Sequence, residues 1–572
     1  MSELIQLSSL DIHFADFIVR IDKNPCDQLW LAAALTSKAA GNGHTCLDMA
    51  DANRLEITTA GNARQLPPPA PETWKTALVA CDTVGNPGDY TPLVMDGAGR
   101  LYLQRSWEYE RLTAEAILSR SRHMPPNPAL LESGLERYFP VTDNQPDLQR
   151  EAARMALTRV FSVISGGPGT GKTATLARIL ALTIELAGDA QPRIALAAPT
   201  GKAAMRLRQS ILLAAEKLGL SDTIRNRLPD EVSTIHRLLG VRSNGNGFRH
   251  NRDNQLPCDL LVVDEASMVD LPLMARLLEA LHDRARVILL GDRDQLASVE
   301  AGAVLADICA GSEDVSGNAV PVTQLTKSYR FAGESGIGTL SRLINAGDGD
   351  SAFELLSSGS YADVVWRQLP AAREFEAAFG AAAQAGYAVY ARTATPGEAL
   401  AELDRFRVLS PLRSGMYGTA NLNRLCEAAL DLRSGEGEPC YRHRPVMISG
   451  NNYELGFFNG DTGVVIENDG RTAVWFSDPE SGLRHLSPLR LPAHETAFAL
   501  TVHKSQGSEF ERMLLILPER MSEALSRELL YTAITRARKQ VEIWSPESVF
   551  RQAVKSRTRR NSGLRDKLAG LM

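Results

Sequence analysis

The sequence is poor in cysteine and lacks the paired spacings through which cysteines usually stabilise a fold. Its 572 residues include seven cysteines, and none of them forms a CxxC pair. An odd, scattered set argues against a disulfide framework and against a zinc site, and it fits a reducing compartment. His44 and Cys46 lie close in sequence. Without a second pair at ligand spacing, they do not predict a metal site.

Long apolar runs are also missing. The mean hydropathy is −0.16, and the sequence contains no apolar run of the roughly 18 residues that a membrane-spanning helix needs. The chain begins Met1-Ser2-Glu3-Leu4, without a basic region followed by an apolar stretch. We therefore predict no transmembrane helix and no secretory signal, and we expect a cytoplasmic protein.

An excess of positive charge is absent as well. Lys and Arg number 62 against 68 Asp and Glu, which gives a formal net charge of −6. This balance excludes a uniformly basic coat for nucleic acid, but it leaves a local basic channel open. Residues 551–572 hold seven cations and one acid, a net charge of +6. The tail could contact DNA or an acidic partner, or it could be a solvated helix end.

Proline clusters and a change of pattern divide the chain. At roughly 150 residues per domain, the length predicts three or four domains. Pro125, Pro126 and Pro128 cannot lie inside a helix, and they end a first region rich in Leu and Ala. Beyond them, short apolar runs alternate with helical stretches, which is typical of parallel sheets covered by helices on both faces. The expected strands are 160–165, 194–198, 260–263, 287–290, 406–410, 498–501, 513–517 and 541–544.

These features predict an α/β protein built from two similar units. We expect a mainly helical N-terminal domain at 1–125, a first α/β domain at 126–335 and a second at 336–572. Within the second, residues 435–492 carry turn signals between short alternating runs and predict a small β insertion.

A phosphate-binding loop follows the first expected strand and precedes an expected helix at 174–187. It fits the pattern GxxxxGK[ST], whose glycines let backbone N–H groups face phosphate oxygens beside the positive end of the helix. In this pattern the lysine reaches the β- and γ-phosphates and the threonine hydroxyl binds Mg²⁺. The sequence therefore predicts ATP and Mg²⁺ as ligands of Gly166, Gly167, Pro168, Gly169, Thr170, Gly171, Lys172 and Thr173.

Two acids at the end of a buried strand complete the expected nucleotide site. We expect Asp264 to hold Mg²⁺ and Glu265 to position and activate the attacking water. Gln295 follows another expected strand and can sense the γ-phosphate. Arg330 ends the first α/β unit and Arg536 lies late in the second. Arginines from two domains can neutralise transition-state charge and couple domain closure to hydrolysis.

Together the motifs resemble those of superfamily 1 helicases. In chain order they begin at Gln149 and include APTGKAA, STIHRLLG, DEAS, GDRDQL, LTKSYR, TVHKSQGSEF and YTAITRAR. The last two spellings are most similar to the RecD branch of superfamily 1B. LDIHFADF and LYLQRSW in the first region resemble the N-terminal domain of the same branch. The resemblance covers most of the chain and implies two RecA-like P-loop domains with an SH3-like β insertion.

The resemblance also implies roles for single residues. Gln149 would read the adenine, Tyr329 would stack on the base, and Glu509 would contact the ribose. Arg330 and Arg536 would contact the γ-phosphate, and Gln295 would couple phosphate to DNA. A single strand of DNA would pass Pro199, Thr200, Thr234, His236, Thr501 and His503.

The implied function is ATP-dependent 5′→3′ DNA unwinding within a RecBCD-type helicase–nuclease that acts in double-strand break repair and homologous recombination. RecB-like and RecC-like subunits would be the partners, and the first domain would dock on the RecC-like scaffold. The sequence holds no convincing nuclease constellation, so any nuclease activity is expected from the partner. A stand-alone helicase, an RNA helicase and a non-translocating ATP-dependent DNA clamp remain alternatives. Residues 243–250 are either a small strand-splitting pin or a plain surface loop.

Overall fold

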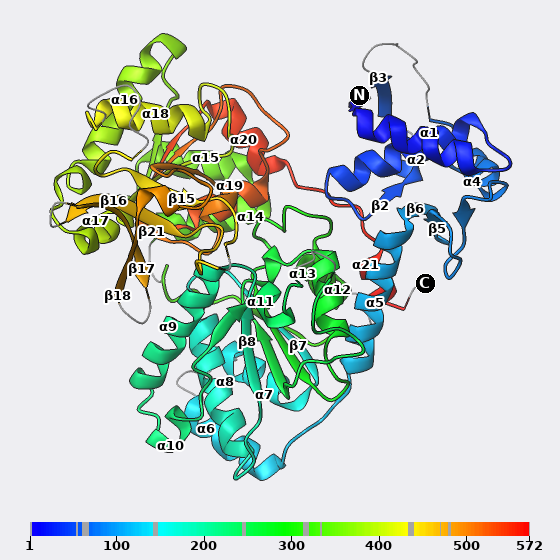
Figure 1. Ribbon diagram of the computed structural model, residues 1–572, viewed down its shortest axis with the longest axis horizontal. Helices are drawn as coiled ribbons and strands as arrows, with labels where there is room; N and C mark the ends of the chain where they lie inside the picture. The colour runs from blue at the N-terminus through cyan, green and yellow to red at the C-terminus, as the bar shows by residue number, and fades with distance from the viewer. Residues whose placement is uncertain are drawn as a thin grey trace.

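The computed structural model shows two α/β domains side by side and a smaller N-terminal domain beside the first (Figure 1). Among the described residues, no helix combines the length and apolarity needed to cross a membrane. The structure describes residues 3–52, 55–59, 68–140, 147–242, 247–312, 320–331, 335–432, 440–452, 454–468, 471–478 and 482–570.

The first α/β domain is built on a six-stranded sheet in the order β12-β7-β11-β10-β8-β9, and all of its pairings are parallel. Helices α6–α9 pack on one face, and α12 and α13 pack on the other. The elements are α6 (Pro128–Tyr138), α7 (Leu148–Thr158), β7 (Phe161–Gly166), α8 (Lys172–Leu186), β8 (Ile194–Ala198), α9 (Gly201–Lys217), α10 (Asp222–Arg225), β9 (Val232–Thr234), α11 (Ile235–Leu239), β10 (Leu260–Val263), η1 (Ala266–Met268), α12 (Leu271–Glu279), β11 (Arg286–Gly291), α13 (Val304–Gly311) and β12 (Val322–Leu325).

The second α/β domain repeats this design with a five-stranded parallel sheet in the order β13-β22-β21-β14-β20. Its faces are covered by α14, α15, α19 and α20 on one side and by α16–α18 on the other. The elements are α14 (Gly336–Ala346), α15 (Gly349–Ser358), β13 (Val364–Arg367), α16 (Ala372–Tyr387), η2 (Tyr390–Arg392), α17 (Pro396–Leu403), β14 (Phe406–Ser410), α18 (Thr419–Ala429), β20 (Ala499–Thr501), η4 (His503–Ser505), β21 (Phe510–Ile516), α19 (Arg527–Ile534), β22 (Ala537–Trp544) and α20 (Glu547–Lys555).

The two parallel sheets confirm the predicted fold of two RecA-like units. Every strand expected in them forms, with ends that differ by a few residues. The agreement has a simple cause. Strands buried on both faces need nearly continuous runs of apolar residues, which stand out in a sequence.

A small antiparallel sheet is inserted in the second domain, as predicted. Its five strands follow the order β18-β17-β16-β15-β19, and the SH3-like assignment stays a prediction. Of the predicted pin at 243–250, residues 243–246 lie outside the described residues, while Val241 and Phe248 form an antiparallel bridge. The insertion comprises β15 (Pro445–Ile448), β16 (Thr462–Asn468), β17 (Arg471–Asp478), β18 (Gly482–Leu486), η3 (Pro488–Arg490) and β19 (His494–Thr496).

The N-terminal domain combines helices with a short four-stranded sheet, β2-β6-β5-β4, and a parallel pair, β1 and β3. Its last helix, α5, sends Ala114 and Ile117 into the core of the first α/β domain, so the proposed boundary at residue 125 is crossed by packing. The elements are β1 (Glu3–Leu7), α1 (Ser9–Ile21), α2 (Asp27–Gly41), β2 (Cys46–Asp48), α3 (Met49–Ala52), β3 (Leu55–Thr59), α4 (Pro71–Val79), β4 (Val84–Gly85), β5 (Leu93–Met95), β6 (Arg100–Leu103) and α5 (Gln104–Arg120).

The C-terminal tail leaves the second α/β domain and returns to the first. Residues 558–568, which we call the C-terminal strap, run from α20 to α21 (Leu564–Leu568) beside α5 (Figure 1). Leu564 and Leu568 lie in the core of the first α/β domain. The amide of Asn561 donates to Nδ1 of His44 at 2.9 Å. Among the tail's cations, Lys567 pairs with Glu110 at 2.7 Å and Arg551 with Asp350 at 2.5 Å, so these two meet acceptors of the chain itself.

A buried carboxylate on α5 holds the strap. Glu110 is fully buried and accepts hydrogen bonds from the Thr45 hydroxyl (2.5 Å), the Ser562 hydroxyl (2.9 Å) and the Gly563 amide (3.1 Å). The Lys567 ammonium lies 2.7 Å from its other oxygen.

We predict that Glu110→Ala destabilises the protein by about 3–5 kcal/mol, because it leaves the buried Lys567 ammonium without its carboxylate. The matched control is Glu115→Ala on the same helix. Glu115 is 60% exposed and pairs with Arg111, so its loss costs less than about 1 kcal/mol. Urea unfolding followed by tryptophan fluorescence compares the variants. Equal midpoints for both would contradict this account of the strap.

Candidate ATP site and nucleic-acid interface

The phosphate loop leaves the end of β7 and turns directly into α8. Gly169 and Gly171 have φ angles of +79° and +86°, a conformation that L side chains rarely adopt. The Lys172 ammonium donates to the carbonyl oxygens of Gly166 at 2.5 Å and Gly167 at 3.2 Å. This local geometry leaves the backbone amides and the N-terminal end of a 15-residue helix to bind an anion.

Gly169 also needs its hydrogen side chain for space. A Cβ atom there would lie 2.3 Å from Cβ of Arg330. We predict that Gly169→Ala weakens nucleotide binding at least about tenfold, since the loop must move away from its phosphate-binding geometry. Gly188→Ala is the control, because Gly188 also has a positive φ, +58°, but no atom within 4 Å. Titration with a fluorescent ATP analogue measures both. Unchanged affinity in Gly169→Ala would refute the prediction.

Three carboxylates follow the ends of β11, which pairs with β7, and of β10, the next strand in the sheet. Asp264 and Glu265 follow β10, and the Glu265 amide donates to Asp264 at 2.9 Å. Burial and then the nearby Glu265 raise the pKa of Asp264 to about 6, while Lys172 opposes this shift. Asp292 follows β11, and its pKa is raised by burial and lowered by Lys172. Thr173 stands one residue after Lys172, so a hydroxyl and carboxylates beside the phosphate loop fit a magnesium–nucleotide complex.

The two α/β domains meet at this edge through hydrogen bonds. The Gln295 amide donates to Asp292 at 3.0 Å, and the Arg536 guanidinium donates to Oε1 of Gln295 at 2.6 Å. The Tyr531 hydroxyl also donates to Asp292, at 3.0 Å, and the Leu296 amide donates to the Thr532 hydroxyl at 2.9 Å. The structure therefore brings together Gln295 and Arg536, two residues predicted to act at the γ-phosphate. Asp292 and Tyr531 were missed by sequence analysis, although Asp292 belongs to the GDRDQL motif.

Arg536 is only 3% exposed. Burial lowers its pKa, and the negative charges of Glu265 and Glu509 oppose that shift. Its Nε donates to the Thr532 carbonyl at 3.1 Å and an Nη donates to the Ser508 carbonyl at 3.3 Å. The guanidinium is thus fixed from three sides before any nucleotide charge is added.

Glu509 is the centre of an arginine cluster. Its side chain is 9% exposed, and it pairs with Arg330 at 2.7 Å, with Arg538 at 2.8 Å and with Arg206. Burial would raise its pKa, but the charges of Arg206 and Arg330 hold the pKa well below its usual range. Arg206 belongs to the first α/β domain and Glu509 to the second, so the cluster connects the two domains. Sequence analysis missed Arg206 and Arg538, because nothing in their local sequence marks this long-range pairing.

The residues expected at the base of the nucleotide lie at the other end of the loop. The Gln149 amide donates to the Thr170 carbonyl at 3.0 Å and accepts from Arg178 at 3.3 Å. The Tyr329 amide donates to the Gly169 carbonyl at 2.8 Å, and Tyr329 is 57% exposed. Both residues are therefore anchored to the phosphate loop, with the tyrosine ring accessible for stacking on a base.

The expected DNA contacts follow the carboxyl ends of strands in both sheets. Thr200 follows β8, Thr234 ends β9 and Thr501 ends β20. The hydroxyl oxygen of each accepts a backbone N–H from the residue three positions on, at 3.2, 3.2 and 3.3 Å. A hydroxyl that accepts in this way keeps its own hydrogen to donate to a phosphate. Burial lowers the pKa of both His236 and His503, so neither adds a positive charge at pH 7.

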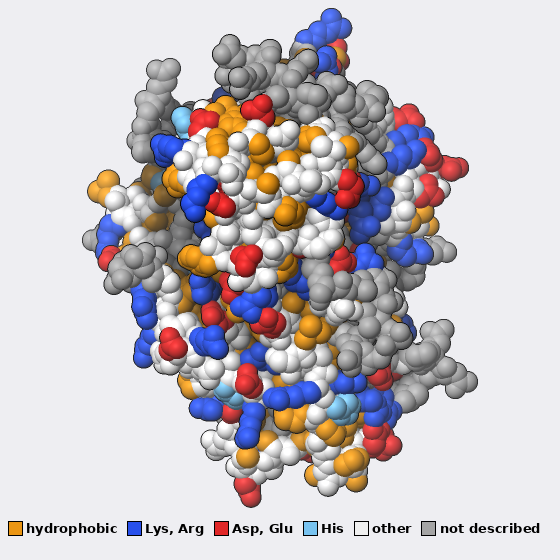
Figure 2. Space-filling view, turned by 90° about the vertical axis from the view of Figure 1, so that its right-hand side faces the viewer, with side chains coloured by type: hydrophobic (Ala, Val, Ile, Leu, Met, Phe, Trp, Pro, Cys, Tyr) orange, Lys and Arg blue, Asp and Glu red, His pale blue; other side chains and the backbone are white. Residues whose placement is uncertain are grey.

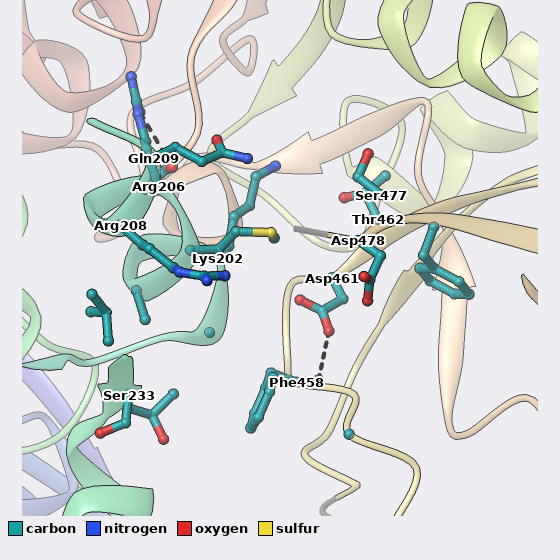
Figure 3. A pocket seen from close by; sticks show the side chains of 18 of the residues that line it. Lys202, Arg206, Arg208, Gln209, Ser233, Phe458, Asp461, Thr462, Ser477 and Asp478 are labelled. Carbon is teal, nitrogen blue, oxygen red and sulfur yellow. Dashed lines mark hydrogen bonds between the residues drawn. The ribbon is translucent and has the colours of Figure 1, made fainter. Parts of the chain in front are cut away.

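A cavity of about 1640 Å³ opens between the first domain and the β insertion. Among the six expected DNA residues, Thr234 and His236 line it. In Figure 3, Lys202, Arg206 and Arg208 lie on the wall formed by α9, across from Asp461 and Asp478 of the insertion. The α9 wall of this interface is thus basic. On the face in Figure 2, by contrast, basic and acidic side chains are interspersed.

The insertion also touches the first domain directly. A Cβ atom on Gly201 would lie 2.6 Å from the Phe458 ring, so this aromatic side chain packs on the backbone at the start of α9. Phe458 comes from the loop before β16 and lines the same cavity. The contact closes one side of the cavity.

Known proteins match both ends of the chain and its centre. The family model "RecBCD enzyme subunit RecD, N-terminal domain" matches residues 3–102, an "AAA domain" matches 149–301, and a "UvrD-like helicase C-terminal domain" matches 496–543. A protein of Mycobacterium tuberculosis named RecBCD enzyme subunit RecD is 40% identical over 570 residues, which cover 98% of this chain and 94% of that protein. The chain belongs to the RecD family.

Other members of the RecD family differ in how much of their length is shared. A RecBCD enzyme subunit RecD of Mycolicibacterium smegmatis is 39% identical over 98% of this chain and 97% of its own. The "ATP-dependent RecD2 DNA helicase" of Deinococcus radiodurans is 32% identical over 82% of this chain, but only 59% of its own length is covered.

Proposed function

We propose that this chain is an ATP-dependent DNA helicase that moves 5′→3′ along a single strand and acts in double-strand break repair and homologous recombination. The observation that carries the proposal is a hydrogen bond between the two domains. The Arg536 guanidinium of one domain donates to Oε1 of Gln295 of the other at 2.6 Å, beside the phosphate loop. Such a site can convert a change in phosphate charge into a change in domain contact.

Within this site the residues divide the work. Lys172 and the loop amides bind the phosphates, while Gln149 and Tyr329 hold the base. Thr173 and Asp264 would hold Mg²⁺, which neutralises phosphate charge when it is bound. Glu265 orients a water for attack and accepts its proton, and Arg536 stabilises the charge that develops on the transferred phosphoryl group.

Arg330 can take part in two different sets of contacts, one without nucleotide and one with it. It now pairs with Glu509 at 2.7 Å, although both residues are expected to contact the nucleotide. We propose that nucleotide binding exchanges this ion pair for contacts to the γ-phosphate and the ribose. The exchange changes the link between Arg206 and Glu509 across the cleft. The threonine hydroxyls at the strand ends then hold DNA phosphates alternately in the two domains, without reading sequence.

The proposed setting is a RecBCD-type complex. The two mycobacterial relatives are named as RecBCD subunits and match this chain over nearly its full length. The first domain would dock on a RecC-like scaffold, and a RecB-like partner would carry the nuclease. A stand-alone helicase is the second candidate, because a relative named as an ATP-dependent DNA helicase is 32% identical.

Translocation tests the proposal and separates it from a clamp. Streptavidin is placed at the 5′ or the 3′ end of a biotinylated single strand, and its ATP-dependent displacement is timed. A 5′→3′ motor displaces it from the 3′ end only. ATP hydrolysis without displacement from either end would contradict the motor and favour a clamp. Equal displacement from RNA would contradict selectivity for DNA, which a protein recognises chiefly by the missing 2′-hydroxyl.

A further inference from the structure

The C-terminal strap contacts the loop that follows Gln295. The Arg560 guanidinium donates to the carbonyl oxygens of Ser298 at 2.5 Å, Glu300 at 2.5 Å and Gly302 at 3.2 Å. Three carbonyls converging on one planar cation fix the path of the whole loop, because the donors of a guanidinium lie in a rigid fork.

This loop is continuous with the contact between the two α/β domains. Leu296, two residues before Ser298, donates to Thr532 and accepts from Gln506 at 3.1 Å, and both partners belong to the second domain. Gln295, the next residue back, accepts from Arg536. Ser298 is only three residues from Gln295, so a shift of the loop at Ser298 would also move the side chain that accepts from Arg536.

The same guanidinium also borders the N-terminal domain. A Cβ atom on Gly43 would lie 3.1 Å from Cζ of Arg560. The Gly302 amide donates to the Gly43 carbonyl at 3.0 Å, and the Thr45 amide donates to the Asn561 carbonyl at 3.0 Å. Three parts of the chain, distant in sequence, thus meet at Arg560.

We propose that Arg560 is a positioning residue for ATP hydrolysis: it holds the 298–302 loop so that Gln295 meets Arg536, and the strap that carries it links this loop to the N-terminal domain. The inference rests on the proposed function and adds a route by which the nucleotide site and the N-terminal domain influence each other. Arg560 touches neither nucleotide nor DNA in this account. It acts through the loop.

Arg560→Gln tests the proposal, with the exposed neighbour Arg559→Gln as the matched control. We expect the DNA-stimulated kcat for ATP to fall about five- to tenfold, the size of a long-range coupling, while KM for ATP stays within about twofold. Hydrogen exchange at the amides of Gly302 and Thr45 should speed up at least about tenfold, because the backbone bonds around Arg560 open more often. Arg560→Lys keeps the positive charge but loses the forked donors. Its kcat and its exchange rates should lie between those of Arg560→Gln and Arg559→Gln.

Hydrogen exchange and the ATPase kcat together distinguish failure of the Arg560 proposal from failure of the proposed function. Exchange at Gly302 and Thr45 that matches the wild type in Arg560→Gln would overturn the proposal, and so would an unchanged kcat. If Arg560→Gln does not fold, the same two readouts on Arg560→Lys decide. A wild-type chain without DNA-stimulated ATPase would refute the proposed function instead, while the exchange comparison would still test the strap.

Discussion

Replacing Glu265 by Gln should abolish most ATP hydrolysis while ATP still binds. The substituted amide would keep the size of the side chain but could not accept the proton of the attacking water, and a general base contributes about 10²–10⁴-fold to rate. The position is specialised, because Glu265 has a left-handed backbone, φ +51°, two residues after the end of a buried strand. Steady-state ATPase with saturating single-stranded DNA and titration of a fluorescent ATP analogue measure the two effects separately.

The control for this variant is Glu279→Gln on α12, a carboxylate that pairs with Arg276 at 3.0 Å. It should leave kcat unchanged within about twofold, since a single partly exposed ion pair contributes little. A Glu265→Gln enzyme with more than about a tenth of wild-type kcat would show that another group accepts the proton. Loss of ATP binding in the same variant would show that Glu265 shapes the site instead of serving as the base.

Arg536→Lys should lower kcat about 10³-fold with only a small change in ATP affinity, because an arginine that stabilises the transition state is worth about 10³–10⁵-fold. Lysine keeps the positive charge. However, it cannot donate simultaneously to Gln295, Thr532 and Ser508, as Arg536 does at 2.6, 3.1 and 3.3 Å. The charge is therefore no longer fixed where the phosphoryl group develops its negative charge.

Arg538→Lys, two residues further on, is the matched control for this charge-conserving change. Arg538 is 53% exposed and pairs with Glu509, so its replacement should change kcat less than about threefold. Single-turnover ATPase measures both variants. Similar rates for Arg536→Lys and the wild type would remove Arg536 from the chemistry and leave it a structural role in the domain contact.

Local patterns made much of the site predictable. The phosphate loop, the acids after β10 and the motif around Gln295 each follow the end of a strand, where a buried apolar run gives way to polar residues. Arg536, by contrast, lies between α19 and the start of β22. Parallel strands place all such ends at one edge of a sheet. The apolar runs therefore predict the two sheets and the edge at which the phosphate loop, Asp264 and Gln295 gather, but not the contact of Gln295 with Arg536, which joins the two domains.

Long-range pairing could not be predicted in this way. Arg206 and Glu509 lie far apart in the sequence, yet they form an ion pair in the structure. Arg560 was one of seven cations in a tail whose charge suggested DNA, a partner or solvent, and it meets three carbonyls of the chain's own loop instead. Backbone carbonyls carry no signature in sequence, so a cation that binds them cannot be told from a solvated one.

The central claim is that one ATP site, built by both α/β domains, drives directional unwinding of DNA. The most direct test is unwinding of duplexes with a 5′ or a 3′ single-stranded overhang, by the chain alone and with the proposed RecB-like and RecC-like partners, the RecB-like ATP site being inactivated. A Lys172→Gln variant is the control. We predict ATP-dependent unwinding from the 5′ overhang only, lost in Lys172→Gln. Unwinding from the 3′ overhang, or unwinding that survives in Lys172→Gln, would contradict the account.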